Sequence, residues 1–471
     1  MLCLALICAP FALGSIPPLA ITVLVKWLFA AAFLWTLDCI LEQRTPRFPR
    51  SLLISATLVM LLGWFMTWNA RSVYMPIHGS SVSIRPPFPF APGSENQTVS
   101  LLAMLRLSAL LATLFVVADL TRRTVWKTRL LYALAFAGAG IALFGLIQQA
   151  GLVKFVAAKM NPYEGIYFST FNYHANAGAY LNLALPPLCV LTLMSFLTHR
   201  SIWRRIVLFA MLALVIVATF ANTSRGAQAI TVGLLLGLIG WGVKRLLAKS
   251  SALARSRRMV LPVVIVLMIL AIGAMGFGYS RNAKKWRQLP EQLSKNSSRW
   301  QVWRIAVPMA REGGPLGKGP GMFKMLLPRS PLLSDALYSR WIIQAHIPGE
   351  KISMWSMAHN DYLQAWVEFG WAGACLLGVI FFGGIARGIG YARRRVEKAA
   401  RPYDFTWIGI VASLLGVTVH ATFDFPLQIA SLQLTVAVLL GMCWRLPPSP
   451  TGKSPASASG EKPEFPPALP G

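Results

Sequence analysis

The sequence predicts an all-α, polytopic membrane protein with about 12 transmembrane helices and one long loop that contains short helices. Of its 471 residues, 55% are hydrophobic and only 13% are charged, whereas a soluble domain usually carries about 25% charged residues. The apolar residues also form long runs, and a run of roughly 18 or more with few charges is typical of a transmembrane helix.

Twelve apolar runs are the predicted spans. The first is short for a crossing of about 20 residues, and Gly14 and the pair Pro17-Pro18 separate it from the second. It is therefore either a re-entrant piece or a span whose true start is missing. The predicted spans are 1–14, 18–41, 51–69, 99–118, 128–149, 176–196, 206–221, 226–247, 259–279, 361–385, 405–421 and 427–444.

The distribution of Lys and Arg predicts the orientation. One set of loops, at 44–50, 122–129, 200–205, 244–258 and 387–401, holds 22 basic residues, and the short loops of the opposite set hold five. Cytoplasmic loops carry the basic excess in membrane proteins. We therefore expect both termini in the cytoplasm and the long loop on the opposite side of the membrane.

The chain divides into four predicted regions. Nine spans fill residues 1–279, the long loop follows at 280–360, and three spans fill 361–445. Residues 446–471, rich in Pro, Ser and Gly, form a disordered cytoplasmic tail. Residues 280–358 carry 13 Lys or Arg against four acids. This charge suits a lipid diphosphate, and it equally suits attraction to anionic lipid head groups.

Composition and motifs exclude several classes of site. The net charge is +29, but the basic residues are divided among short loops and no nucleic-acid-binding module is visible, so no nucleic acid is expected as a partner. The six cysteines lie in or beside apolar runs without a CxxC pair. No Asp-x-Asp or Glu-x-Asp occurs. We therefore expect neither a metal site nor a cofactor, and cationic side chains to take the place of a divalent ion.

Two arginines are candidates for binding phosphate. Arg225 lies in the hairpin Asn222-Thr223-Ser224-Arg225-Gly226, which joins two spans with almost no linker. Arg299 follows Ser297 or Ser298, a good N-cap, so it lies in the first turn of a helix, where an anion is favoured. Arginine binds phosphate through a planar, bidentate fork. The alternatives are an arginine that snorkels to lipid head groups and a solvated surface helix.

Three titratable residues lie at the predicted outer surface. His359 precedes the tenth span, and a histidine near neutral pH can take a proton from a hydroxyl. Asn360 or Asp361 then caps the helix that follows. His420 and Asp424 share the last outward turn, where a carboxylate can orient an imidazole or anchor an arginine. The alternatives are a capping histidine and a capped inter-helix turn.

Polar residues also stand where the sixth span begins. Asn172, His174 and Asn176 offer groups suited to hydrogen bonds with sugar or phosphate, or simply form a polar helix start. Arg106 lies inside the fourth span, where a charge is costly and often functional, unless its side chain snorkels outward. The glycine-rich stretch 314–321 lacks P-loop spacing, so we interpret it as a tight turn.

Together the motifs resemble those of the O-antigen ligase and O-antigen polymerase family. Each string alone is weak, but five occur in order and all on one side of the membrane by the charge count. They are Thr-Phe-Asn-x-x-x-Asn-Ala-Gly (170–178), Thr-Ser-Arg-Gly (223–226), Ser-Arg-Trp followed by Pro-Leu-Gly-x-Gly (298–319), His-Asn-Asp-Tyr-Leu-Gln (359–364) and His-x-x-x-Asp-Phe-Pro-Leu-Gln (420–428).

The resemblance implies glycan transfer at the periplasmic face of a bacterial inner membrane. The donor would be a glycan on polyprenyl (undecaprenyl) diphosphate, and the acceptor lipid A–core, another glycan unit or a protein. The family's essential arginines match Arg225 and Arg299, and its essential histidine matches His359. The substrate-binding candidates are then Asn172, His174, Asn176, Asn360, His420 and Asp424.

Two other functions remain possible on the sequence alone. Twelve spans also suit a transporter, but transporters usually show repeated halves with polar residues at mid-membrane, whereas here the polar residues gather at one face and no internal repeat is visible. The other possibility is a non-catalytic partner in polysaccharide export.

Overall fold

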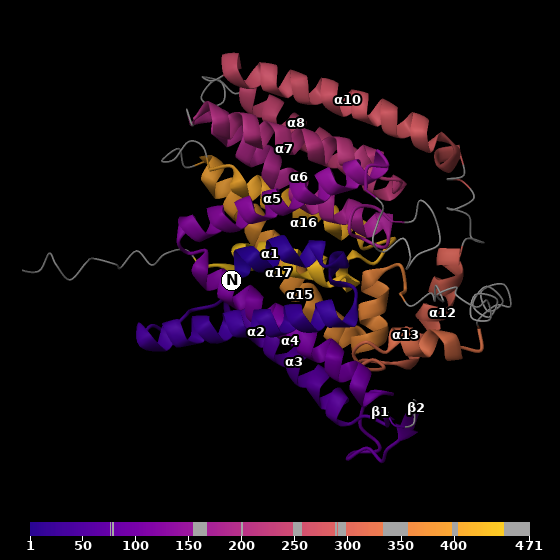
Figure 1. Cartoon of the computed structure of the whole chain (residues 1–471). Helices are drawn as coiled ribbons and strands as arrows, with labels where there is room; N and C mark the ends of the chain where they lie inside the picture. Colours follow the sequence, from indigo (N-terminus) through magenta and orange to yellow (C-terminus); the bar gives the residue numbers. More distant parts are fainter. Residues whose placement is uncertain are drawn as a thin grey trace, which may run out of the picture.

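The computed structural model describes residues 1–75, 77, 80–153, 167–198, 201–247, 257–287, 290, 298–332, 357–397 and 404–446. The predicted tail beyond residue 446 and the middle of the long loop lie outside these ranges. The described chain is a bundle of helices (Figure 1).

A helix occupies each of the twelve predicted spans. These helices are α1 (Leu2–Phe11), α2 (Pro18–Leu41), α3 (Arg50–Trp68), α4 (Gln97–Leu120), α5 (Thr124–Gln149), α6 (His174–Leu197), α7 (Ile202–Ala221), α8 (Arg225–Leu247), α10 (Arg257–Arg287), α15 (Asp361–Glu397), α16 (Thr406–His420) and α17 (Ala430–Trp444).

Not all of these helices are long enough to cross a bilayer unaided. Within the described residues, eight are long and apolar enough, namely α2 to α8 and α15. The apolar parts of α1, α10, α16 and α17 have 10–17 residues. The chain is thus a helical membrane protein with several spans, and the count of twelve crossings stays a prediction.

Some element ends differ from the expected ones. Helix α1 has ten residues and is followed by a short 3-10 turn, η1 (Leu13–Ser15), in which Gly14 has a φ of 66°. Helix α10 continues to Arg287, beyond the expected end of the span at 279. A hairpin of two short antiparallel strands, β1 (Ser72–Met75) and β2 (Ser80–Ser83), was not predicted, and it joins α3 to α4.

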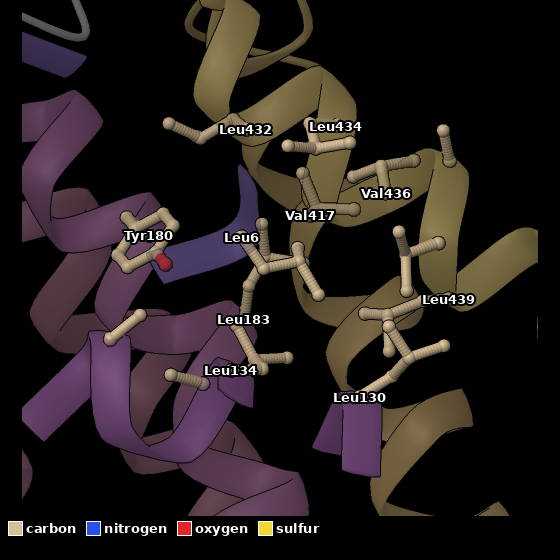
Figure 2. Close-up of a cluster of buried hydrophobic side chains, with 14 of the residues drawn as sticks. Leu6, Leu130, Leu134, Tyr180, Leu183, Val417, Leu432, Leu434, Val436 and Leu439 are labelled. Atoms are coloured by element: carbon tan, nitrogen blue, oxygen red, sulfur yellow. The ribbon is translucent and has the colours of Figure 1, made fainter. Parts of the chain in front are cut away.

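The core of the bundle is built from small and branched apolar residues. Figure 2 shows Leu6 of α1, Leu134 of α5, Leu183 of α6 and Leu432 of α17 among the side chains that gather there, all of them buried. Burial of each such side chain stabilises a fold by about 1.5–3 kcal/mol in water. Inside a bilayer, close packing replaces this driving force.

Helix α6 lies at the centre of the bundle. Almost every residue from Ala175 to Leu188 is buried, and Gly138 of α5 lies directly against the Ala184 side chain. Helix α16 packs on α6, where the Ser413 hydroxyl donates to the Leu183 carbonyl. This contact fixes the end of α16 beside the start of α6.

A small separate core orders the described part of the long loop. It contains α12 (Ser298–Glu312), α13 (Phe323–Leu326) and η3 (Leu327–Arg329). Val302, Ile305 and Phe323 pack with Val367 of α15. In Figure 1, α12 and α13 lie at the same end of the bundle as β1 and β2.

The glycine-rich stretch of this loop is a tight turn, as predicted. Gly317 and Gly319 have φ values of 83° and 112°, which favour glycine. The Lys318 and Gly319 amides donate to the carbonyls of Val367 and Glu368. Helix α15 breaks at Gly370, whose φ is 66°, because the turn approaches its backbone there. The stretch therefore attaches the loop to α15.

Candidate active site

One buried carboxylate forms the centre of the candidate site. Asp424 lies in the turn between α16 and η4 (Pro426–Gln428), and it is 2% exposed. Its Oδ1 accepts from the Phe425 amide at 3.0 Å and lies 3.2 Å from His359 Nδ1. Its Oδ2 lies 3.3 Å from Arg299 NH2 and accepts from the Tyr173 hydroxyl at 3.4 Å. Four strings of the sequence thus meet at one side chain.

The backbone around His359 is fixed on both sides. Trp303 of α12 donates from Nε1 to the Ala358 carbonyl, and the Ala358 amide donates to Gln364 Oε1. His359 itself has a φ of 50°, an uncommon conformation for a residue with a side chain, typical of positions under functional constraint. These contacts aim the imidazole at Asp424.

Aromatic rings enclose the imidazole. The rings of Tyr173 and Phe425 stack at 5.5 Å with an angle of 6° between their planes. The His359 ring stands edge-on to both, at 6.3 Å from Tyr173 and 4.7 Å from Phe425. Packing of this kind holds a ring in one orientation. With Nδ1 on the carboxylate, Nε2 is the nitrogen that can accept a proton.

Arg225 is brought to the same site by packing of its hairpin. The Asn222 side chain donates to the His174 carbonyl at the start of α6, and Gly178 lies against Ala227 so closely that a Cβ would clash. Gly226 in turn lies against the ring of Phe423, the neighbour of Asp424. Arg225 therefore begins α8 next to the glycine that packs against the Asp424 turn.

The charges at the site hold Asp424 ionised. Burial alone would raise the pKa of this carboxyl, but the hydrogen bond and charge of His359, together with Arg299, lower the pKa to about 2. Burial alone would lower the pKa of the Arg299 guanidinium, but the neighbouring Asp424 carboxylate raises it. Burial and Asp424 also raise the pKa of the Tyr173 phenol, which therefore stays neutral.

The remaining predicted residues surround this centre. His420 is 1% exposed and its ring stacks on Phe423, beneath the turn. Asn176 is buried inside α6, and Asn360 accepts from the Leu363 amide as the N-cap of α15. Asn176 and Asn360 thus have structural roles in α6 and at the start of α15. Binding of substrate by either residue stays a prediction. Asn172 and His174 flank Tyr173 and are half-buried.

Tyr173 and Phe425 were not among the predicted site residues. Both stand inside strings that were singled out, at 170–178 and 420–428. The sequence did offer one hint of their role, because each aromatic residue stands next to a polar candidate: Tyr173 lies between Asn172 and His174, and Phe425 follows Asp424. Nothing in the sequence shows that these two rings stack, because they are separated by some 250 residues.

A groove in the membrane-spanning part begins at the site. It has a volume of about 1100 Å³, and it lies between α8, α16 and the end of α15. Gly226 and Phe423 line one end, and Lys244 and Arg393 line the other. No atom lies within 4 Å of a Cβ built on Gly233 or Gly237, so these glycines leave the groove open. We call it the α8–α16 groove.

The cationic groups at the site suit an anion, and His359 suits proton transfer. In the part of the chain that the structure describes, no three His, Cys, Asp or Glu residues are grouped to hold a metal ion. The predicted independence of a metal remains to be tested.

A comparison with known families agrees with the motifs. Residues 210–378 match the family model of O-antigen ligases. The resemblance predicted from the motifs is confirmed over this segment, which contains Arg225, Arg299 and His359. Tyr173 and Asp424 lie outside it. No curated protein matches the chain.

Over residues 210–378 the chain is thus similar to O-antigen ligases. The several long apolar helices agree with a multi-pass membrane protein.

Proposed function

We propose that the protein transfers a glycan from a polyprenyl diphosphate, such as undecaprenyl diphosphate, to an acceptor hydroxyl at the periplasmic face of the inner membrane. The observation that carries this proposal is the cluster around Asp424, where one carboxylate contacts both the histidine and an arginine. Such a cluster combines an oriented base with a cationic site for a leaving diphosphate.

Each residue has a separate part in the reaction. Nε2 of His359 takes the proton of the acceptor hydroxyl, while Asp424 holds Nδ1 and stabilises the imidazolium that forms. The acceptor oxygen forms a bond to the anomeric carbon, and the bond from that carbon to the diphosphate oxygen breaks. Arg225 and Arg299 bind the diphosphate and stabilise the negative charge that it carries away.

The α8–α16 groove fits the lipid of the donor. It begins at Gly226, next to Arg225, and its lining on α8 continues to Lys244. At 1.5 Å per residue this is a length of about 27 Å, close to the roughly 30 Å of the hydrocarbon layer. A polyprenyl chain in the groove places its diphosphate beside the two arginines.

Three kinds of acceptor are compatible with the proposed glycan transfer. Lipid A–core would make the protein an O-antigen ligase, another lipid-linked glycan would make it a polymerase, and a protein hydroxyl would make it a protein glycan ligase. The cluster around Asp424 serves all three. A transporter is disfavoured because the cluster lies at one end of the bundle and not at mid-membrane.

The test separates donor binding from transfer. We expect Arg225→Ala and Arg299→Ala to weaken binding of the donor lipid, and Lys at either position to restore it only in part, since Lys lacks the planar fork. His359→Ala and His359→Gln should bind donor normally and lose transfer by about a hundredfold or more. Both are measured on purified protein in nanodiscs.

A matched control lies on the same helix as Arg299. Arg304 is exposed on α12, so Arg304→Ala should keep both donor binding and transfer. Substantial transfer by folded His359→Ala would contradict the base assignment. Equal losses for Arg304→Ala and Arg299→Ala would mean that only the general charge of the loop matters.

A further inference from the structure

One residue of α15 holds both ends of the turn that carries Asp424. The Asp361 backbone amide donates to the Ala421 carbonyl at 2.9 Å, where the turn begins. The Asp361 carboxylate accepts from the Leu427 amide at 2.9 Å and from Gln428 Nε2 at 3.0 Å, where the turn ends. Asp424 lies between these attachments, in the middle of the turn. We call these three contacts the Asp361 clamp.

The Asp361 carboxylate does not serve as the cap of its own helix. Asp361 is the first residue of α15, after the N-cap Asn360, and an acid at that position ordinarily stabilises a helix through its dipole. Here the two carboxylate oxygens instead accept from residues 66 and 67 positions later in the chain. Asp361 is 4% exposed. Because a buried carboxylate is costly unless it is hydrogen-bonded, these two partners determine where it lies.

The second half of the turn is held by three helices. The Gln428 side chain donates to Asp361 of α15, and its backbone carbonyl accepts from Arg106 NH1 of α4 at 3.3 Å. The carbonyl of Leu427 accepts from Gln433 Nε2 of α17 at 2.6 Å. These contacts give a structural role to Arg106, whose charge inside a span is costly. They also place the end of the turn by polar contacts with α4, α15 and α17.

The clamp affects the distance between His359 and Asp424. His359 precedes Asp361 by two residues, so their Cα atoms are at most about 7 Å apart. The imidazole lies 3.2 Å from Asp424 Oδ1, and this distance depends on where the turn lies relative to the start of α15. Asp361 contacts the turn on both sides of Asp424. A shift of the turn away from Asp361 would therefore lengthen the contact between His359 and Asp424.

We propose that Asp361 is a positioning residue, which sets the contact between His359 and Asp424 by fastening the turn to the start of α15. It acts through the imidazole and the carboxylate and not on the substrate itself. A reacting group displaced by about 1 Å can lose roughly a hundredfold in rate. The effect of Asp361 on glycan transfer rests on the proposed function, whereas its effect on the contact does not.

Three variants separate a clamp from a helix-dipole role. Asp361→Asn keeps the shape, because its oxygen can accept from the Leu427 amide and its amide group can donate to Gln428 once the Gln428 amide turns over. Asp361→Glu keeps a charge in the first turn of α15 but is longer by one methylene. Asp361→Ala removes the charge and the side-chain contacts. A clamp predicts that Asn is tolerated better than Glu, and a helix-dipole role predicts the opposite order.

The first measurement reports the contact without any glycan transfer. Protein with isotope-labelled histidine is reconstituted in nanodiscs for solid-state NMR, and the His359 Nδ1 signal is identified by its absence from His359→Gln. We expect Asp361→Asn to keep the wild-type signal, and Asp361→Ala and Asp361→Glu to shift it as the contact with Asp424 is lost. Thermal unfolding checks that each variant is folded. An unchanged signal in Asp361→Glu would overturn the proposal, even if Asp361→Ala fails to fold.

Kinetics then measure what the contact does for transfer. Asp361→Ala should lower kcat by about tenfold to a hundredfold, and Asp361→Asn should stay near the wild-type rate. The KM for the donor should change less than kcat, because Arg225 and Arg299 lie on α8 and α12 and not on the turn. A merely structural role would reduce the amount of folded protein and leave kcat per folded molecule unchanged. That result would reject the positioning role.

A variant of Gln428 tests the other side of the clamp. Gln428→Met keeps the length of the side chain but loses the donor to Asp361, so kcat should fall less than in Asp361→Ala, where the Leu427 amide also loses its partner. The double variant should be no slower than Asp361→Ala alone, because both changes remove the same contact. Losses that multiply in the double variant would show that the two residues act separately, which would contradict the clamp.

Glu368 provides the matched control. It is a second buried acid of α15, about two turns further along the helix. It accepts from the Gly321 amide and from Gln364 Nε2 and not from the turn. Glu368→Gln should therefore keep both the His359 signal and kcat. Equal effects of Glu368→Gln and Asp361→Ala would mean that loss of any buried acid from α15 displaces His359, which would reject a specific clamp.

The two readouts separate this proposal from the proposed function. If the His359 signal responds to the Asp361 variants as expected but the wild-type protein transfers no glycan, the proposed function fails and the clamp stands. If the wild-type protein transfers glycan but the His359 signal and kcat are unchanged in Asp361→Ala and Asp361→Glu, the clamp fails and the proposed function stands.

Discussion

The two ends of the helix bundle arrange charge in opposite ways. At the end that bears Lys127 and Arg44, these two cations are each paired with acids. Lys127 contacts both oxygens of Asp404 at 2.9–3.0 Å and Thr406 at 2.7 Å, and Arg44 contacts three acids. At the other end, one buried carboxylate, Asp424, is shared by His359 and Arg299.

This difference separates structural charges from functional ones. A buried cation with its own acid is neutralised and fixes two helices together. A site where cations outnumber carboxylates keeps positive charge available for an anion, and perturbed groups gather at such sites. The comparison predicts that variants at the two ends fail in different ways.

The largest effect is expected for Asp424→Asn. The variant keeps the size of the side chain but loses the charge that orients His359 and stabilises its imidazolium, so transfer should fall by about a hundredfold or more. Because the pKa of Asp424 is about 2, the carboxylate is ionised in the wild-type protein at neutral pH. Initial rates of the two proteins at neutral pH will therefore measure the effect of the missing charge.

The result has a clear contrary outcome. If Asp424→Asn kept the wild-type rate, the carboxylate would neither orient His359 nor stabilise its imidazolium, and its role at the centre of the cluster would be wrong.

Lys127→Met should instead reduce stability. The Lys127 side chain is 2% exposed and that of Asp404 is 19% exposed. Removing the cation leaves a carboxylate that water can still reach in part, so we expect a loss of about 3 kcal/mol or less. Thermal unfolding in detergent measures the loss, and transfer per folded molecule should be unchanged.

A double variant is the control for this end. Adding Asp404→Leu to Lys127→Met removes the unpaired acid and should recover part of the stability, as replacement of a whole buried pair often does. A variant that stays folded but loses transfer would show that this end also takes part in the reaction.

The sequence predicts the parts of the molecule that depend on local pattern. Apolar runs predict where the helices lie, and the strings at 223–226, 298–299 and 359 point to the residues now found around Asp424. The glycine turn at 314–321 is also predicted, because positive φ angles depend on local residue type.

What the sequence does not predict are contacts between distant segments. The stacking of Tyr173 on Phe425, the bond of Trp303 to Ala358 and the break of α15 at Gly370 all arise when separate helices pack together. The role of Asn360 as a cap was one of two local options, and only the structure chooses it over Asp361. Arg106 was singled out for its charge alone. The cavity of about 320 Å³ that it lines forms only where α4, α15 and α17 pack together.

A smaller effect is expected for Tyr173→Phe. The hydroxyl donates to Asp424 over 3.4 Å, which is a weak contact, and the stacked ring is kept. Removal of one such bond costs about 0.5–1.5 kcal/mol, so transfer should fall about tenfold or less. Tyr173→Ala, which also removes the ring beside His359, should fall further, and equal rates for the two variants would show that the ring does not position the imidazole.

The smallest effect is expected from removing divalent metal. Asp424 already accepts from Arg299 and the Phe425 amide and contacts His359, so a metal ion would have to displace cations that are in place. Arginines at the diphosphate supply the charge that paired carboxylates and a metal ion supply elsewhere. Transfer by the purified protein should be the same in EDTA as in buffer with Mg²⁺. A strict requirement for Mg²⁺ or Mn²⁺ would contradict this view of the site, because a metal ion and not the arginines would then supply the positive charge for the diphosphate.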